Sequence, residues 1–224
     1  MGIAESIALL RKEIPQHVKI VAVSKTMPQV LVKEAYDAGQ RAFGENRVQE
    51  LTEKQLFLPK DTEWHLIGHL QTNKVKYVVP FVSLIQSVDS LKLLSEINQE
   101  ACKIGRTIDC LLQMRIAREE TKFGLSFAEA KQMLNSDEFK SYQSIKLTGL
   151  MGMATFTNET SRVKEEFFQL ARYFEEIKTK WFSNDASFRE LSMGMSGDYK
   201  LALEAGSTMV RIGSLILGER NYKR

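Results

Sequence analysis

Residues 18–44 read VKIVAVSKTMPQVLVKEAYDAGQRAFG, and this stretch contains the repeating unit of the whole chain. Its first six residues are mostly β-branched or apolar, which predicts a buried strand. A helix is predicted from Pro28 to Tyr36, because proline is favoured in a first turn and Gly39 can take the left-handed conformation that ends a helix. Residues 41–44 then predict a second, brief strand. The order of strand, helix and strand is typical of α/β proteins.

The same alternation continues to the end of the chain. Six further apolar runs predict strands, at residues 64–67, 82–85, 108–113, 145–150, 190–192 and 209–212. The segments between them predict helices, at residues 46–56, 72–78, 89–105, 126–134, 159–181 and before Gly206. Eight strands alternating with helices predict one α/β domain over residues 1–224, a (β/α)8 TIM barrel with an extra N-terminal helix at residues 3–14. An open doubly wound sheet is the alternative, because the second, seventh and eighth strands are short.

Three polar residues are expected to cap helices at their N-termini. Asn46 is followed by Gln49 at the spacing of a capping box, and Ser126 is followed by Glu129 at the same spacing. Asp89 precedes a run of leucines and isoleucines at helical spacing, so it is expected to cap that helix.

The composition excludes several classes of protein. The 224 residues are 43% hydrophobic and 26% charged, as in an ordinary globular protein. The net charge of +3 is too small to predict binding to nucleic acid or to an anionic membrane. No apolar run approaches the roughly 18 residues that span a bilayer, and no signal peptide is visible. We therefore expect a cytoplasmic protein that binds neither membranes nor nucleic acid.

The cysteines and histidines do not predict a disulfide framework or a metal site. Cys102 and Cys110 are the two cysteines of the chain, and both lie among apolar residues, so we expect buried, inert thiols in a reducing compartment. His65 and His69 have the spacing of a helical zinc pair, but the segment between them reads as a strand that ends at a glycine.

Lys25 is the first candidate functional residue. Alternation along the first strand places it on the same face as Val21 and Val23. If that face points into the barrel, the amine lies at the C-terminal ends of the strands, where barrel enzymes place their sites. Apolar surroundings favour the free amine, which is the form that condenses with an aldehyde. The alternative is a solvent-facing lysine in a loop.

Two glycine- and serine-bearing turns form a candidate anion site. Residues 192–198 read SMGMSGD after the seventh strand, and residues 211–214 read RIGS after the eighth. Free backbone N–H groups and the positive end of the helix dipole attract anions at such turns. Barrel enzymes commonly bind phosphate after these two strands. The alternative is that the glycines permit tight turns and the serines cap helices.

Arg211 ends the eighth strand and would point across the mouth of the barrel. Its guanidinium stays protonated and only donates hydrogen bonds. Opposite a pyridine nitrogen it would favour the unprotonated ring, which argues against chemistry that needs a full carbanion. The alternative is a salt bridge with Glu190 or Glu204.

Five motifs together resemble one known family. They are VAVSKT at residues 21–26, FGENRVQE at 43–50, WHLIGHLQTNK at 64–74, LSMGMS at 191–196 and GSTMVRIG at 206–213. In this order they resemble the pyridoxal phosphate homeostasis proteins, which look like the N-terminal barrel of alanine racemase standing alone. The resemblance implies a non-enzymatic protein that binds pyridoxal 5′-phosphate. It would carry, buffer or deliver this cofactor, with effects on amino-acid and keto-acid balance.

The resemblance also implies roles for individual residues. Lys25 would hold the cofactor as a covalent aldimine, Asn46 would lie beside the ring, and Arg211 would face the pyridine nitrogen. Phosphate contacts would come from the two turns, at Ser192, Met193, Gly194, Ser196, Gly213 and Ser214. No catalytic residue and no metal ligand is implied. The partners would be the cofactor itself and PLP-dependent apoenzymes, and we expect a monomer.

Three positions depart from the related sequences. Arg47 stands where many members of the family have tyrosine, and Ser214 stands where threonine is frequent. In the segment 120–124, Lys122 replaces an arginine of the racemase loop after the fifth strand. The resemblance further implies that the second, β-rich domain of alanine racemase is absent, because few residues follow the eighth strand.

Two other functions remain as alternatives. The first is a PLP-dependent racemase or lyase of small amino acids that uses Lys25 as its base. Racemisation by two bases needs an acid–base group on each face of the substrate, and Tyr36 and Tyr199, the rim candidates, lie on expected helix faces. The second is an interaction module without a cofactor, against which the two serine–glycine turns argue.

Overall fold

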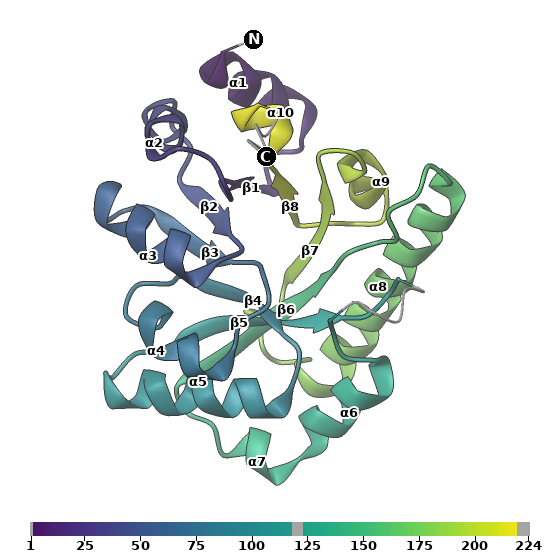
Figure 1. The fold of residues 1–224 in the computed structure, drawn as a ribbon. Coiled ribbons are helices and arrows are strands. Elements are labelled where there is room, and N and C mark those ends of the chain that lie inside the picture. The colour runs from purple at the N-terminus through teal and green to yellow at the C-terminus, as the bar shows by residue number, and fades with distance from the viewer. Residues whose placement is uncertain (1, 118–122, 219–224) are drawn as a thin grey trace.

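The computed structural model describes residues 2–117 and 123–218 and shows eight parallel strands closed into a barrel (Figure 1). The strands are β1 (Lys19–Val23), β2 (Ala42–Glu45), β3 (Glu63–Leu66), β4 (Leu84–Val88), β5 (Ile108–Met114), β6 (Ile145–Gly152), β7 (Glu190–Met195) and β8 (Met209–Ile212). Each strand pairs with the next in chain order, and β8 pairs with β1. The predicted (β/α)8 barrel is confirmed, and the open sheet is excluded.

Helices surround the barrel on its outer face (Figure 1). They are α1 (Ile3–Glu13), α2 (Gln29–Asp37), α3 (Val48–Phe57), the 3-10 turn η1 (Thr72–Lys74), α4 (Val75–Val78), α5 (Leu91–Lys103), α6 (Phe127–Asn135), α7 (Asp137–Lys140), α8 (Thr160–Trp181), α9 (Tyr199–Glu204) and α10 (Ser214–Leu217). None of those in the described segments is long and apolar enough to cross a membrane.

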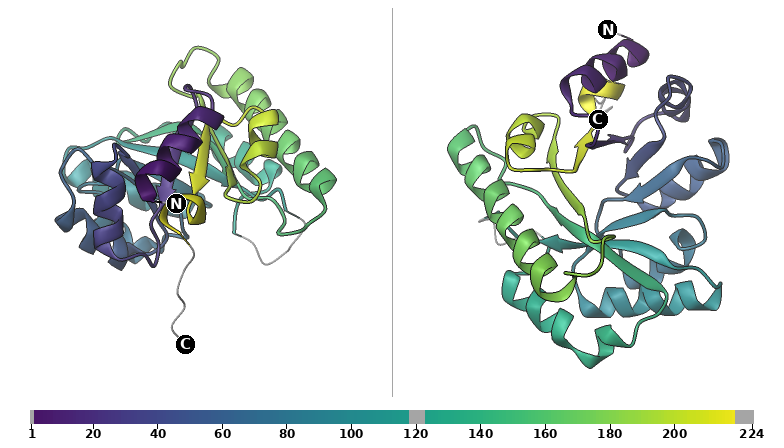
Figure 2. Two further views of the ribbon diagram at one scale, coloured as in Figure 1. Left: turned by 90° about the horizontal axis from the view of Figure 1, so that it is seen from above. Right: turned by 180° about the vertical axis from the view of Figure 1, so that it is seen from behind.

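The extra helix α1 joins the start of the chain to its end. It packs beside α2 and α10 (Figure 2) and buries Ile3, Ile7 and Leu10. At its last residue, Glu13 Oε2 accepts a 2.6 Å hydrogen bond from Tyr199 Oη of α9. The predicted N-terminal addition is confirmed, and it helps to hold the first and last segments of the barrel together.

Two expected helix caps are wrong. The helix α3 begins at Val48, and the side chain of Asn46 does not cap it. The helix α5 is capped by Ser90, whose Oγ accepts a hydrogen bond from a backbone N–H of the first turn, rather than by Asp89. Asp89 instead pairs with His69, whose Nδ1 lies 3.1 Å from Asp89 Oδ2. No cluster of three metal-binding side chains occurs in the described segments.

The capping box predicted at Ser126 is confirmed. Ser126 Oγ accepts from Glu129 N at 3.2 Å, and Glu129 Oε2 accepts from Ser126 N at 2.7 Å.

Of the two thiols expected to be buried, only one is. Cys110 is buried in β5, where burial raises the pKa of its thiol. Cys102 is exposed, because the apolar face of α5 that packs on the sheet does not include it.

An apolar layer crosses the interior of the barrel. It consists of side chains that point inward from six strands, namely Val21, Ala42, Leu84, Leu111, Met151 and Met209. Inward side chains fill small barrels of this kind, so that the interior is a packed core and not a pore.

A chain of hydrogen bonds, which we call the interior polar column, runs beside this layer. Gln86 Nε2 lies 2.9 Å from His65 Nδ1, and Gln86 Oε1 accepts a 2.7 Å bond from Ser192 Oγ. Ser192 Oγ in turn accepts a 2.6 Å bond from Nη1 of Arg211. All four residues are buried. Because each link satisfies a buried polar group, the column specifies one arrangement of β3, β4, β7 and β8.

The column also fixes the state of His65. The amide N–H of Gln86 can only donate, so His65 Nδ1 accepts and the ring proton lies on Nε2. Burial lowers the pKa of His65 to about 3. The imidazole is therefore neutral at pH 7.

Replacing Gln86 by leucine should destabilise the fold without changing core volume greatly. Gln86→Leu removes the acceptor of the buried Ser192 hydroxyl and the donor to His65 Nδ1, which should lower the free energy of unfolding by about 1–3 kcal/mol. Chemical denaturation followed by circular dichroism measures this loss. The control is Gln99→Leu on the exposed face of α5, which should cost little. Equal stability of both variants would contradict a structural role for the column.

Acid should destabilise the protein through His65. The folded pKa of about 3 lies below the unfolded value of 6.5, so below pH 6.5 the unfolded chain binds a proton that the folded protein does not. Between pH 8 and pH 5 we expect this group alone to lower the free energy of unfolding by about 2 kcal/mol. Urea denaturation at both pH values measures the change, and His65→Gln should reduce the pH dependence by that amount. The same dependence in both proteins would contradict a neutral, buried His65.

Candidate functional site

A cavity of about 610 Å³ lies at the C-terminal ends of the strands. Its wall comes from the segments that follow β1, β2, β3, β6, β7 and β8. Six residues singled out in the sequence line it, namely Lys25, Asn46, Ser196, Arg211, Gly213 and Ser214. The closed barrel thus brings the predicted amine, the arginine and parts of both turns to one place.

The alternation along β1 is as predicted. Val21 belongs to the interior apolar layer, and Val23 and Lys25 both line the cavity above it. Lys25 is half-buried. The chain then turns at Thr26, whose φ of 63° lies in the left-handed region that favours glycine.

Arg211 is buried and held from behind. Its Nη1 donates to Ser192 Oγ at 2.6 Å, and its Nη2 donates to the carbonyl of Gly152 at 2.9 Å. Burial lowers the pKa of Arg211 to about 10, so the guanidinium stays charged at neutral pH. The expected alternative partners do not bind it, because Glu190 lies beside Arg189 and Glu204 pairs with Lys164.

The two turns of the candidate anion site are joined to each other. Gly213 N donates to Ser196 Oγ at 3.2 Å. Asp198 Oδ1 accepts from Met195 N at 2.5 Å and so closes the turn after β7. Burial raises the pKa of Asp198, and the charge of Arg211 opposes that shift. Asp198 ends the turn at residues 192–198, and its role was not predicted from the sequence.

Three residues expected to contact phosphate do not line the cavity. Ser192 is fully buried within the interior polar column. Met193 is fully buried in the core around the barrel. Gly194 has a φ of 91°, and a Cβ there would lie 2.6 Å from Cβ of Ala202. These residues set the path of the turn, and the surface of the cavity begins at the residues after them.

Asn46 lies in the cavity wall and carries an unsatisfied polar atom. Its Oδ1 is buried and has no hydrogen-bond partner within the described residues. Its backbone packs on Gly68, where a Cβ would lie 2.4 Å from the carbonyl oxygen of Asn46. Arg47 does not line the cavity; its side chain is 74% exposed and lies 3.8 Å from Glu50. Arg47 therefore lies outside the cavity wall.

The segment after β6 also lines the cavity and was not predicted from the sequence. Residues 153–158 line the cavity, and Phe156 is 97% exposed at this place. Glu166 of α8 holds the segment by accepting from Thr155 N at 2.6 Å and from Thr155 Oγ1 at 2.7 Å. The rule that sites in such barrels lie at the C-terminal ends of the strands could have identified this segment from the sequence. Lys122 lies outside the described residues.

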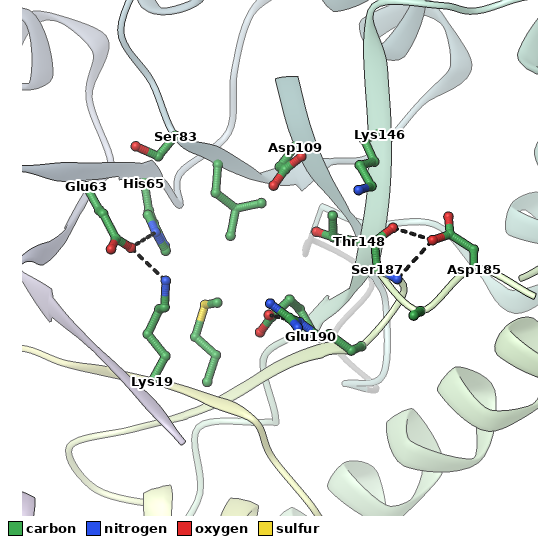
Figure 3. Close-up of a pocket in the computed structure, with 14 residues that line it drawn as sticks. Lys19, Glu63, His65, Ser83, Asp109, Lys146, Thr148, Asp185, Ser187 and Glu190 are labelled. Carbon is green, nitrogen blue, oxygen red and sulfur yellow. Dashed lines mark hydrogen bonds and ion pairs between the residues drawn. The ribbon is translucent and has the colours of Figure 1, made fainter. Parts of the chain in front are cut away.

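A second hollow, of about 600 Å³, lies at the opposite ends of the strands (Figure 3). Four of its charged side chains form two ion pairs, Lys19 with Glu63 at 2.6 Å and Arg189 with Glu190 at 3.4 Å. The neutral His65 faces Glu63 at 4.0 Å. Ligand sites of (β/α)8 barrels lie at the other end, so the cavity around Lys25 is the candidate site.

Comparison with known proteins agrees with this geometry. The family model of the alanine racemase N-terminal domain matches residues 2–221. The pyridoxal phosphate homeostasis protein of Aquifex aeolicus is 38% identical over 205 residues, 91% of this chain and 88% of that protein. The human protein of the same name is 40% identical over 215 residues, 92% of this chain and 78% of that protein.

A solved structure gives the same result. PipY of Synechococcus elongatus PCC7942, solved with PLP bound, is 36% identical with a TM-score of 0.88. The alignment covers 97% of this chain and all of that one. The chain therefore belongs to the alanine racemase N-terminal domain family and, within it, to the pyridoxal phosphate homeostasis proteins.

Proposed function

We propose that this protein binds pyridoxal 5′-phosphate in the cavity around Lys25 and carries, buffers or delivers it without converting a substrate. One observation carries the proposal. A single cavity joins a lysine amine, a buried arginine, an unsatisfied amide and two linked turns that offer backbone N–H groups and hydroxyls.

The residues of the wall fit the parts of this cofactor. Oδ1 of Asn46 has no partner among the described residues and can bond to a polar substituent of the ring. Arg211 has further N–H groups beyond the two that bind Ser192 and Gly152, and it can donate to the ring nitrogen. The turns at Ser196 and at residues 213–214 can hold the phosphate.

Lys25 supplies the primary amine. The cofactor's aldehyde condenses reversibly with a primary amine and releases water. Arg211 stays positively charged and only donates, so it favours an unprotonated pyridine ring. That ring withdraws electrons weakly, which suits a protein that holds the cofactor and does not use it to stabilise a carbanion.

The relatives support the same role. Those from Aquifex aeolicus and human are named for pyridoxal phosphate homeostasis, and PipY was solved with PLP bound. Their names do not assign a reaction. We extend the cofactor, though not the individual contacts, from these proteins to this chain.

The lining of the cavity favours a carrier over a racemase. Among the described lining residues, Lys25 and Asp198 are the groups besides Arg211 that can exchange protons, and Asp198 is occupied in its own turn. The two rim candidates point elsewhere, since Tyr36 bonds to Asp61 and Tyr199 bonds to Glu13. A two-base racemase needs a second group on the opposite face of the substrate.

The proposal also covers the location, oligomeric state and partners of the protein. We place the protein in the cytoplasm as a monomer in which residues 1–224 act as one cofactor-binding domain that serves PLP-dependent apoenzymes. Two free cysteines suit a reducing compartment. The exposed large apolar side chains are distributed over several elements, such as Leu9 on α1, Leu56 on α3 and Ile104 after α5.

Borohydride should label Lys25. Purified protein mixed with the cofactor should show a visible absorbance band that borohydride abolishes, and peptide mapping should find the fixed cofactor on Lys25. Lys25→Ala should lose the band. Lys146→Ala, at the opposite hollow, should keep it and serves as the control. Labelling of another lysine in the unaltered protein would refute the assigned attachment point.

Amino acids should not be racemised. The loaded protein should exchange the α-deuterium of labelled alanine, serine or valine no faster than free cofactor at the same concentration, because a pyridine ring that Arg211 keeps unprotonated stabilises an α-carbanion weakly. Nuclear magnetic resonance of the α-position measures the exchange. Exchange at ordinary enzymatic rates, about 1 per second or more, that Lys25→Ala abolishes would establish the racemase alternative instead.

A further inference from the structure

The backbone on both sides of Lys25 is tied to three charged side chains behind the cavity wall. These residues are Glu45 at the end of β2 and Glu50 and Lys54 on α3, and we call them the support cluster. None of the three lines the cavity. Their contacts reach Ser24 and Thr26, the two neighbours of Lys25.

Lys54 is the centre of the support cluster. Its ammonium group is buried, with 5% of the side chain exposed. Nζ donates to the carbonyl of Ser24 at 2.7 Å and to Glu45 Oε1 at 2.6 Å, and Glu50 Oε2 lies 3.4 Å away. An ammonium has three N–H donors, and here each has an acceptor. Lys54 thus fixes the residue before Lys25.

Glu45 holds the same residue from a second direction. Its Oε1 accepts a 2.6 Å bond from Ser24 Oγ in addition to the bond from Lys54. Its side chain is fully buried, and Oε2 has no partner in the described segments. A buried ion pair of this kind is weak evidence for net stability. Its position against Ser24 is therefore better explained by what it holds in place.

Glu50 holds the residue after Lys25. Its Oε2 accepts a 2.7 Å bond from Thr26 N. Within residues 2–117 and 123–218, Thr26 is the one non-glycine residue with a positive φ. A strained conformation persists only where its surroundings over-determine it. The bond from Glu50 is such a constraint, and it lies one residue from the amine that the proposed function requires.

We infer that Glu45, Glu50 and Lys54 are positioning residues that hold the Lys25 amine at the cavity and so set how long the cofactor is retained. The inference rests on the proposed function. Attachment joins Lys25 Nζ to the aldehyde carbon and expels the carbonyl oxygen as water, and release is the reverse reaction with water. After hydrolysis, a fixed backbone keeps Nζ near the aldehyde carbon and so raises the effective concentration of the amine. Reattachment then competes with escape of the cofactor, and release is slower.

Glu50 gives the most informative variant, because its side chain is partly exposed. When Glu50 is removed, the buried ammonium of Lys54 still has Glu45 as its partner. Glu50→Ala removes the acceptor of Thr26 N and should speed release about tenfold. Glu50→Gln retains an acceptor oxygen and should release the cofactor at a rate close to that of the unaltered protein. Glu63→Ala breaks the exposed ion pair with Lys19 at the far end of the barrel and is the matched control.

A second variant tests the contacts of Glu45 and Lys54 with Ser24. The double replacement of Glu45→Gln with Lys54→Met removes both members of the buried pair, so that neither charge is left alone. It should also release the cofactor about tenfold faster. If it does not fold, the Glu50 pair of variants still decides the question.

The measurement is release of pyridoxal 5′-phosphate after rapid dilution of loaded protein, followed by loss of the visible band. The melting temperature of each cofactor-free variant is recorded beside it. Faster release by Glu50→Ala but not by Glu50→Gln or Glu63→Ala supports positioning. Equal release rates in all folded variants overturn it. Borohydride mapping separates the two proposals: if Lys25 of the unaltered protein is never labelled, the proposed function has failed.

Discussion

Closure of the barrel between β1 and β8 is the constraint on which the site depends. Residues Lys19–Ala22 pair in parallel with Met209–Ile212, so segments from the two ends of the chain lie side by side. This ladder places the lysine after β1 next to the arginine of β8 and the turns after β7 and β8. In an open sheet these strands could be far apart, and the amine and the anion site would not share a cavity. The helix α1, packed beside α10, supports the same junction from outside.

A closed barrel must also fill its interior, and this requirement links stability to the site. Six apolar side chains form one layer, but the interior polar column runs past them from His65 to Arg211. A buried guanidinium is costly unless its N–H groups are bonded. Ser192 and the carbonyl of Gly152 meet that need for Arg211 and leave its charge in place at neutral pH. The residue that would face the cofactor ring is therefore held by the core.

The fold was predictable because the spacing of apolar residues along the sequence follows the buried face of each strand and helix. Alternation along β1 placed Lys25 correctly on the inner face, and strand order placed Arg211 near it. One error came where neighbouring polar residues compete for one role, as when Ser90 and not Asp89 caps α5. Asn46 does not cap α3 for a different reason: the helix begins at Val48, and Asn46 lies in the cavity wall. The segment after β6 has no periodicity to read, and only its place at a strand end could have identified it. The support cluster joins residues far apart in sequence, so it could not be seen before the structure.

The two ends of the barrel use charge differently. At the N-terminal ends of the strands, Lys19 and Glu63 form an ion pair at one side of the hollow (Figure 3). At the C-terminal ends, the ion pair of Glu45 with Lys54 lies behind the wall and binds the backbone that carries Lys25. Charges that neutralise one another within a hollow leave little for a ligand to gain. Charges placed behind the wall keep the groups that face the cavity in position and leave them available.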